Sequence, residues 1–203
     1  MPLRTVVLLG ALVSVLGIGA SFAQAQPKPP TLSEAQKQKL EAGEVLTRAR
    51  LVQPHDATLA RAMGVIEASP EDVWRHIDRC EHFKEFVPRV VESEVLSREG
   101  EILRFRSKVD MPFPLKDIES ELKCRHRDYG GKVFERRWKG LTGPLHVNEG
   151  FWRIFPWPGK RTLVVYTARI APRARIPAKL RVAAQRITLP KTVLALRKRA
   201  TKQ

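Results

Sequence analysis

The side chains that most often carry chemistry in proteins are scattered along this chain. Its five histidines, His55, His76, His82, His126 and His146, lie far apart in the sequence. None has a spacing that joins it to a serine or cysteine nucleophile and an acid. The sequence also lacks an HExxH motif and a glycine-rich phosphate loop. We therefore expect no catalytic residue, no metal site and no cofactor.

The two cysteines, Cys80 and Cys124, allow two readings. An oxidising compartment permits a disulfide between them. The sequence does not show whether their Cα atoms lie within bonding range. A disulfide and a pair of free thiols therefore both remain possible. Two cysteines this far apart in the sequence do not form a metal site.

An arginine within an aromatic stretch is the least usual residue of the chain. If residues alternate as in a strand, Arg136 points inward between Phe134 and Trp138. A buried, unpaired guanidinium is costly, so it needs Glu119, Glu121 or an anionic ligand headgroup as its partner. A bulge in the same stretch would instead turn the side chain outward.

The elements that position these residues follow from capping and periodicity. Ser69 caps a helix that has Pro70 at its first position, and a second short helix covers residues 81–87. The remaining apolar residues alternate with period two and are separated by turn residues, which predicts an antiparallel meander. The expected strands are 44–52, 58–68, 89–97, 101–109, 117–127, 132–140, 146–155 and 161–170.

Residues 176–200 predict one long closing helix, which Pro190 should kink or split. Leu180, Ala184 and Ile187 lie at helical spacing and define an apolar side. We expect this side to cover the sheet, since no other long cover is available. The basic remainder could contact an anionic membrane through Arg181, Arg186, Lys191, Arg197, Lys198 and Arg199.

The first residues have a pattern that is typical of a targeting segment. A basic start, an apolar run and the Ala23-Gln24-Ala25 pattern predict a signal peptide at residues 1–25. We therefore expect export, to the periplasm of a bacterium. Residues 26–43 form a proline-rich spacer and a short helix, and residues 44–203 form one domain.

The net charge of +16 indicates an anionic partner. Export makes nucleic acid the poorest candidate, and no zinc-finger or RNP-like motif is present. A membrane surface fits better, although solubility alone could also explain the charge. We expect a monomer.

Five stretches together resemble the helix-grip, START-like superfamily, which includes lipid-transfer domains, polyketide cyclases and coenzyme Q-binding proteins. They are "GVIEASPEDVWRHI", "FKEFVPRVVESEVL", "MPFPLKDIESEL", "EGFWRIFP" and the closing helix, which span about Glu44 to Thr201. Within "PLKD", Lys116 stands where relatives commonly have Arg. The resemblance implies an α+β fold, in which a curved antiparallel sheet of about six to seven strands wraps around the final helix. It also implies a hydrophobic cavity between them.

Period-two alternation then gives the candidate lining of that cavity. A solidly packed core without a void is the plain alternative for the same residues. The expected function is to bind and carry a lipid or another large hydrophobic molecule. The alternative is a cyclase- or dehydratase-like enzyme for a polyketide or sterol-like substrate, which works mainly by folding a chain inside a shaped cavity. The candidate ligand-binding residues are Phe86, Leu103, Phe105, Leu122, Phe134, Arg136, Trp138, Trp152, Tyr166, Leu180, Ala184 and Ile187.

Overall fold

The structure is a computed structural model that describes residues 25–111 and 116–202. The predicted signal peptide lies outside the described residues apart from Ala25. Part of the "PLKD" stretch, at residues 114 and 115, also lies outside them.

The fold is α+β, with eight antiparallel strands in one curved sheet in the order β1-β2-β8-β7-β6-β5-β4-β3. All eight expected strands join the sheet, so it has one or two strands more than the six to seven predicted. Every pairing is antiparallel. The strands are β1 Leu46–Val52, β2 Ala57–Ile66, β3 Val90–Glu99, β4 Ile102–Val109, β5 Ile118–Tyr129, β6 Val133–Gly140, β7 Leu145–Trp157 and β8 Arg161–Pro172.

Helices α1 and α2 begin where a serine side chain satisfies one of their first N–H groups. In α1 (Glu34–Glu41), Ser33 and Gln36 form a reciprocal capping box. In α2 (Pro70–Asp78), the Ser69 hydroxyl accepts from the Asp72 backbone N–H, as its position predicted. A 3-10 turn, η1 (Cys80–His82), leads into the short α3 (Phe83–Phe86). The last helix, α4 (Ala178–Ala200), continues through Pro190 as one element.

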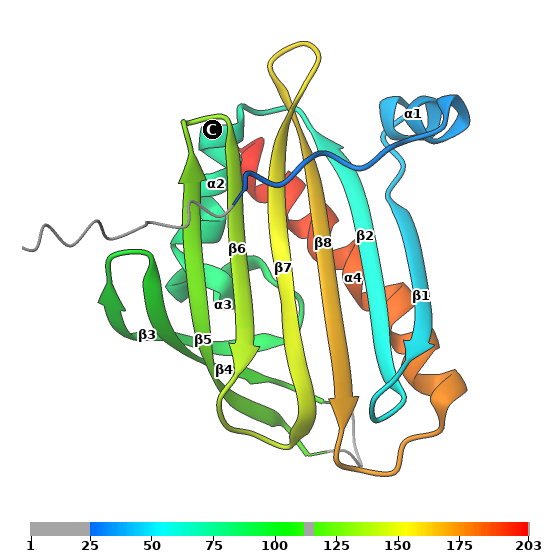
Figure 1. Cartoon of the computed structure of the whole chain (residues 1–203), viewed down its shortest axis with the longest axis vertical. Helices are drawn as coiled ribbons and strands as arrows, with labels where there is room; N and C mark the ends of the chain where they lie inside the picture. The colour runs from blue at the N-terminus through cyan, green and yellow to red at the C-terminus, as the bar shows by residue number, and fades with distance from the viewer. Residues whose placement is uncertain (1–24, 112–115, 203) are drawn as a thin grey trace, which may run out of the picture.

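The two faces of the sheet carry two separate apolar clusters. The larger cluster joins the inner face to α2, α3 and α4, which lie together on one side of the sheet (Figure 1). We call this side the inner face. The larger cluster contains residues of β4, β5, β6, β7 and β8 together with Val73, Ile77 and Leu196. The candidate site therefore lies between the sheet and these helices.

The closing helix covers only one part of the inner face, because it packs mainly on β1 and β2. Ala49, Ala60 and Ala62 are buried beneath it. At Gly64 an added Cβ would lie 3.0 Å from Cγ1 of Val193. Small side chains thus let the helix approach the sheet closely at this edge.

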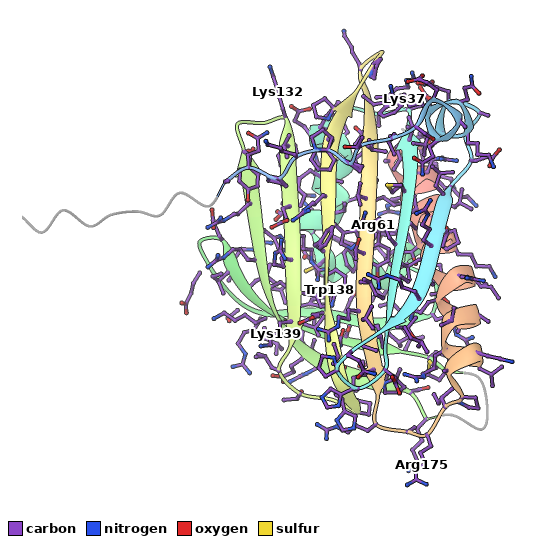
Figure 2. All side chains as sticks on the ribbon, turned by 45° about the vertical axis from the view of Figure 1, so that its right-hand side comes forward. Lys37, Arg61, Lys132, Trp138, Lys139 and Arg175 are labelled. Atoms are coloured by element: carbon purple, nitrogen blue, oxygen red, sulfur yellow. The ribbon has the colours of Figure 1, made fainter. Side chains whose placement is uncertain are left out.

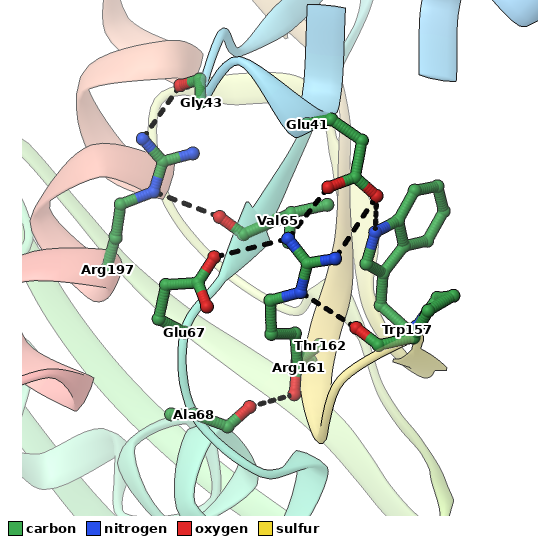
Figure 3. A network of polar contacts seen from close by, with 10 residues as sticks. Glu41, Gly43, Val65, Glu67, Ala68, Trp157, Arg161, Thr162 and Arg197 are labelled. Carbon is green, nitrogen blue, oxygen red and sulfur yellow. Dashed lines mark hydrogen bonds and ion pairs between the residues drawn. The ribbon is translucent and has the colours of Figure 1, made fainter. Parts of the chain in front are cut away.

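The outer face is covered at one end by the N-terminal segment (Figure 1). Leu40 is 1% exposed and packs with Met63, Phe155 and other residues of β2, β6, β7 and β8. A carboxylate of the same helix closes this contact, since Glu41 accepts 2.8 and 3.2 Å bonds from Arg161 (Figure 3). The Trp157 indole N–H donates to the same carboxylate at 2.7 Å. The first described residues therefore pack against the sheet.

Candidate functional site

Six of the predicted apolar cavity residues lie on the inner face and are buried. Strand alternation places them there, because their neighbours in sequence point to the other face. They are Leu103, Phe105, Leu122, Phe134, Trp138 and Trp152.

Aromatic rings make up much of this inner surface. The Tyr166 ring stacks on Trp152 with centroids 3.9 Å apart and lies 5.9 Å from the ring of Trp138. On the α3 side, Phe83 meets Phe105 and Phe86 edge to face. Aromatic rings in contact prefer such offset-stacked or edge-to-face arrangements. The inner face is thus built of large apolar side chains.

Arg136 points inward and is 3% exposed, which settles the two directions that the sequence left open. Register is continuous on both sides of β6 at this position, so no bulge turns the side chain out. Its expected carboxylate partners are elsewhere. Glu121 pairs with Arg104 and Arg106, and Glu119 lies opposite Lys108 on the outer face.

The guanidinium of Arg136 is held by neutral groups. Its Nε–H donates to Nε2 of His126 at 3.1 Å, and an Nη–H donates to Sγ of Cys124 at 3.4 Å. Its Cζ lies 4.9 Å from the ring centroid of Phe83 and 5.3 Å from that of Phe105. Ring faces attract a cation. They do not neutralise it, so the inner face holds a positive charge.

His126 connects this arginine to an acid near the surface. Its Nδ1 lies 2.7 Å from Oδ1 of Asp78, so the ring donates to the carboxylate and accepts from Arg136. Both contacts fit a neutral ring with its proton on Nδ1. Burial lowers the pKa of His126 to about 4, against the opposing effect of Asp78. The hydrogen bond from His126 in turn lowers the pKa of Asp78.

The cysteines are both free and buried beside Arg136. Burial raises the pKa of Cys80 to about 11 and also raises that of Cys124. Thiols that stay protonated are weak nucleophiles. Near Arg136 they serve as soft, neutral acceptors.

Three helix residues do not line the inner face, so that part of the prediction is wrong. Leu180 is 61% exposed, Ile187 is 56% exposed, and Ala184 is exposed as well. The buried side of α4 consists instead of Leu189, Thr192, Val193 and Leu196. The helix has two stripes of apolar residues at helical spacing, and periodicity alone does not tell which one meets the sheet.

The six cations predicted to contact a membrane divide into two groups. Arg181 and Arg197 donate to backbone carbonyls, of Asp56 in the first case and of Val65 and Gly43 in the second (Figure 3 shows the latter). Arg199 pairs with Glu85 at 2.7 Å. Arg186, Lys191 and Lys198 are exposed.

Half-buried apolar residues border the buried core of the inner face. They come from α3, the loop after it, β3, β8 and the first half of α4. Each packs partly on the main core and keeps part of its surface in solvent. They are Phe86, Val87, Val90, Tyr166, Ile170 and Val182.

The Asp78–His126–Arg136 chain is the feature that sequence analysis missed. Alternation in "DIESELKCRHR" already placed His126 on the same face as Cys124. The contribution of Asp78 from the end of α2 required the packing of that helix against the sheet.

The family model described as "Polyketide cyclase / dehydrase and lipid transport" matches residues 66–197. This is more than half of the chain, so the protein belongs to that family. None of the curated proteins matches the chain.

Solved structures share the fold at low identity. A STAR-related lipid transfer protein from Xanthomonas axonopodis has a TM-score of 0.69 at 18% identity, covering 78% of this chain and 94% of its own. Human STARD10 has a TM-score of 0.68 at 15% identity, covering 78% and 69%. The Zhui aromatase/cyclase from Streptomyces has a TM-score of 0.54 at 20% identity, covering 70% and 92%. The START-like, helix-grip fold is thereby shown.

Proposed function

We propose that this protein is exported and carries a lipid or another large hydrophobic molecule between its sheet and α4. The observation that supports this most is the half-buried apolar border beside the aromatic inner face. A ligand there would remove apolar surface from water, which contributes about 25 cal/mol per Å2. The family and the lipid-transfer relatives support the same class of ligand.

The first half of α4 fits the role of a lid. All buried residues of this helix lie from Leu189 onward, whereas Leu180, Ala183, Ala184 and Ile187 are exposed. A side-chain hydrogen bond from Arg181 to Asp56 ties this half to the β1–β2 turn. Few buried contacts mean a low free energy of local opening. Opening of this half would uncover the part of the inner face next to Val182.

The outer side of the same helix would contact an anionic membrane. Its protruding Leu180, Ile187 and Leu194 stand among the exposed Arg186, Lys191 and Lys198. Apolar side chains enter the headgroup region, and each nearby cation adds about 1 kcal/mol with anionic lipid. Among the described residues, no helix combines the length and the apolar character needed to cross a bilayer.

Native mass spectrometry of gently purified protein tests carriage. We expect a bound mass that corresponds to an intact lipid or similar apolar molecule. Bare protein, combined with no uptake of added long-chain lipids, would contradict the proposal.

Co-sedimentation with phosphatidylglycerol vesicles tests the membrane contact separately. The variant L180S/I187S should sediment at least about tenfold less than the native chain, because both side chains protrude. A matched change on the buried side is not suitable as a control, since V193S would damage the core. Leu51→Ser, at an exposed leucine of β1, serves instead. Equal sedimentation of all three proteins would reject this surface.

An enzyme of the cyclase or dehydratase class is the second candidate, and Tyr166 is the residue that favours it. Desolvation raises the pKa of Tyr166 to about 12, so its hydroxyl remains a proton donor beside the inner face. His126 is a poor base in this geometry, because Arg136 occupies its Nε2 lone pair. Turnover of a polyketide substrate that Tyr166→Phe abolishes would favour this candidate over carriage.

A further inference from the structure

The outer face of the sheet, beyond the part that the N-terminal segment covers, is strongly basic (Figure 2, where Arg61 and Lys139 are labelled). Two acids lie between these cations. Glu135 is held by Arg153 at 2.6 Å and by Arg137 at 2.9 Å, and Glu149 is held by Arg169 at 2.8 Å. The outward-pointing cations are Arg48, Arg50, Arg61, Lys123, Arg125, Arg137, Lys139, Arg153 and Arg169.

Register sets several of these cations directly against one another. Like charges in directly opposite positions of neighbouring strands destabilise a sheet. The fold alone does not require this arrangement, and an anionic partner would relieve it. The pairs are Arg48 with Arg61 and Lys123 with Lys139.

Two adjoining hollows run through this surface, with volumes of about 430 and 380 Å3. Lys139, Glu149 and Arg169 line both of them, so together they form one groove across the strands. At its far end the stacked rings of His55 and His146 close the second hollow. We call this feature the outer groove.

The floor of the outer groove is apolar, and its sides are cationic. Leu59, Ile102 and Phe151 line it and are half-buried. Two guanidinium groups lie over the Phe151 ring, with Cζ of Arg153 at 4.2 Å and Cζ of Arg137 at 5.5 Å from its centroid. This combination suits a chain that carries acidic and apolar groups together.

The N-terminal segment of the protein already contacts the outer face through both apolar side chains and a carboxylate. Residues 32–41 place Leu32 and Leu40 on apolar residues at the covered end, while Glu41 reaches Arg161 and Trp157 (Figure 3). An apolar side chain on the sheet and a carboxylate on an arginine thus recur within one short segment. The outer groove offers the same two kinds of contact to another chain.

We propose that the outer groove binds an acidic polypeptide segment of a partner protein, one that alternates carboxylates with apolar side chains. A membrane fits this surface less well than it fits α4. Leu59, Ile102 and Phe151 are half-buried, and Leu141 is the one large apolar residue lining the two hollows that is exposed. The large apolar side chains that protrude most, Leu180 and Ile187, lie on α4 at the inner side of the sheet. The outer groove is thus a second site, separate from the proposed carriage of a hydrophobic molecule.

Fluorescence anisotropy of a labelled peptide of alternating glutamate and leucine, titrated with the full chain, tests the proposal. The groove variant K123Q/R137Q/K139Q should bind at least about tenfold more weakly, since close charge pairs at interfaces couple strongly. The control K179Q/K191Q/K198Q removes the same charge from exposed positions of α4 and should bind as the native chain does. Equal losses in both variants would mean attraction to net charge alone and would overturn the proposal.

Two further arms define the kind of partner. Phe151→Ser should abolish the preference for the glutamate–leucine peptide over a glutamate–serine peptide of equal length. A preference that survives would refute the role of the apolar floor. The same triple variant is also tested for binding to an oligonucleotide and to phosphatidylglycerol vesicles. If it loses more affinity for either of these than for the peptide, the acidic polypeptide is the wrong occupant. Should the triple variant fail to fold, Lys139→Gln alone gives the same comparison with a smaller effect.

Discussion

Arg136 is a buried cation whose direct partners in the structure are neutral: an imidazole, thiols and aromatic rings. The nearest acid of its hydrogen-bonded chain, Asp78, acts through His126. A buried charge without a carboxylate is normally unfavourable. Its presence on the inner face favours a ligand that brings its own negative charge.

We expect the protein to lose stability as the pH falls from 6.5 to 4. The folded-state pKa of His126 is about 4, below the ordinary value of 6.5. Between these two pH values the unfolded state binds a proton that the folded state does not, so acidification lowers the free energy of unfolding. The shift corresponds to at most about 3 kcal/mol. Urea unfolding at a series of pH values measures it.

His126→Gln provides the comparison for this effect, because an amide can still donate to Asp78 and accept from Arg136. The variant should show a flatter dependence of the unfolding free energy on pH over this window. An unchanged slope would show that other groups cause the acid sensitivity.

Arg136→Met should change ligand choice more than it changes stability. Methionine keeps an apolar chain of similar length, and replacement of a buried charge by such a residue is often close to neutral. A long-chain fatty acid should lose at least about tenfold in affinity, whereas its methyl ester should lose little, because a charged hydrogen bond contributes about 1.5–3 kcal/mol. Calorimetry with both ligands measures the difference. A parallel loss for acid and ester would contradict an electrostatic role.

At the scale of elements, strand β7 depends on a glycine. A Cβ at Gly150 would overlap the Thr167 carbonyl oxygen and the Trp138 indole. Gly150→Ala should therefore lower the free energy of unfolding by at least about 3 kcal/mol, as severe overpacking does. Gly100→Ala, at a turn with φ of 56° and an open Cβ position, should cost about 1 kcal/mol. Similar values for the two variants would mean that β7 adjusts freely.

Helix α4 shows how one element can present two different surfaces. Val193 and Leu196 are fully buried on the edge of the sheet, whereas Leu180 and Ile187 are more than half exposed. One half of the helix stabilises the fold, and the other remains available for opening or for membrane contact. Both halves have the same amphipathic periodicity in the sequence.

On the scale of the whole molecule, the two faces of the sheet are covered by different parts of the chain. The helices cover the inner face, and the N-terminal segment covers one end of the outer face (Figure 1). The strands separate the two clusters. Changes on the outer face can therefore be tested without altering the inner one.

Leu40→Ser should detach the N-terminal segment from the outer face. Leu40 is 1% exposed, and the loss of a large buried side chain typically costs about 2–5 kcal/mol. Limited proteolysis should cut residues 25–43 faster, and binding of the acidic peptide should increase as more of the face becomes open. Gln38→Ala, on the exposed side of α1, should change neither. Unchanged proteolysis of the Leu40 variant would show that the Arg161–Glu41 contact holds the segment by itself.

The sequence by itself determined the elements and the class of fold. Alternation located all eight strands, Ser69 and Pro70 located the start of α2, and the spacing of five stretches indicated the helix-grip family. These signals are local, because backbone geometry repeats every two residues in a strand and every 3.6 in a helix. The same periodicity placed Phe105, Trp138 and Trp152 on one candidate face, and the structure shows that this face points inward.

The tertiary structure decided which of two possible faces each element buries. Periodicity in α4 fits Leu180 and Ile187 as well as Leu189 and Val193, and only packing against Gly64 distinguishes them. The contact of Asp78 with His126 joins residues 48 positions apart, and the outer groove depends on register across the sheet. Such contacts arise because chain folding brings distant segments together, which no short stretch of sequence encodes.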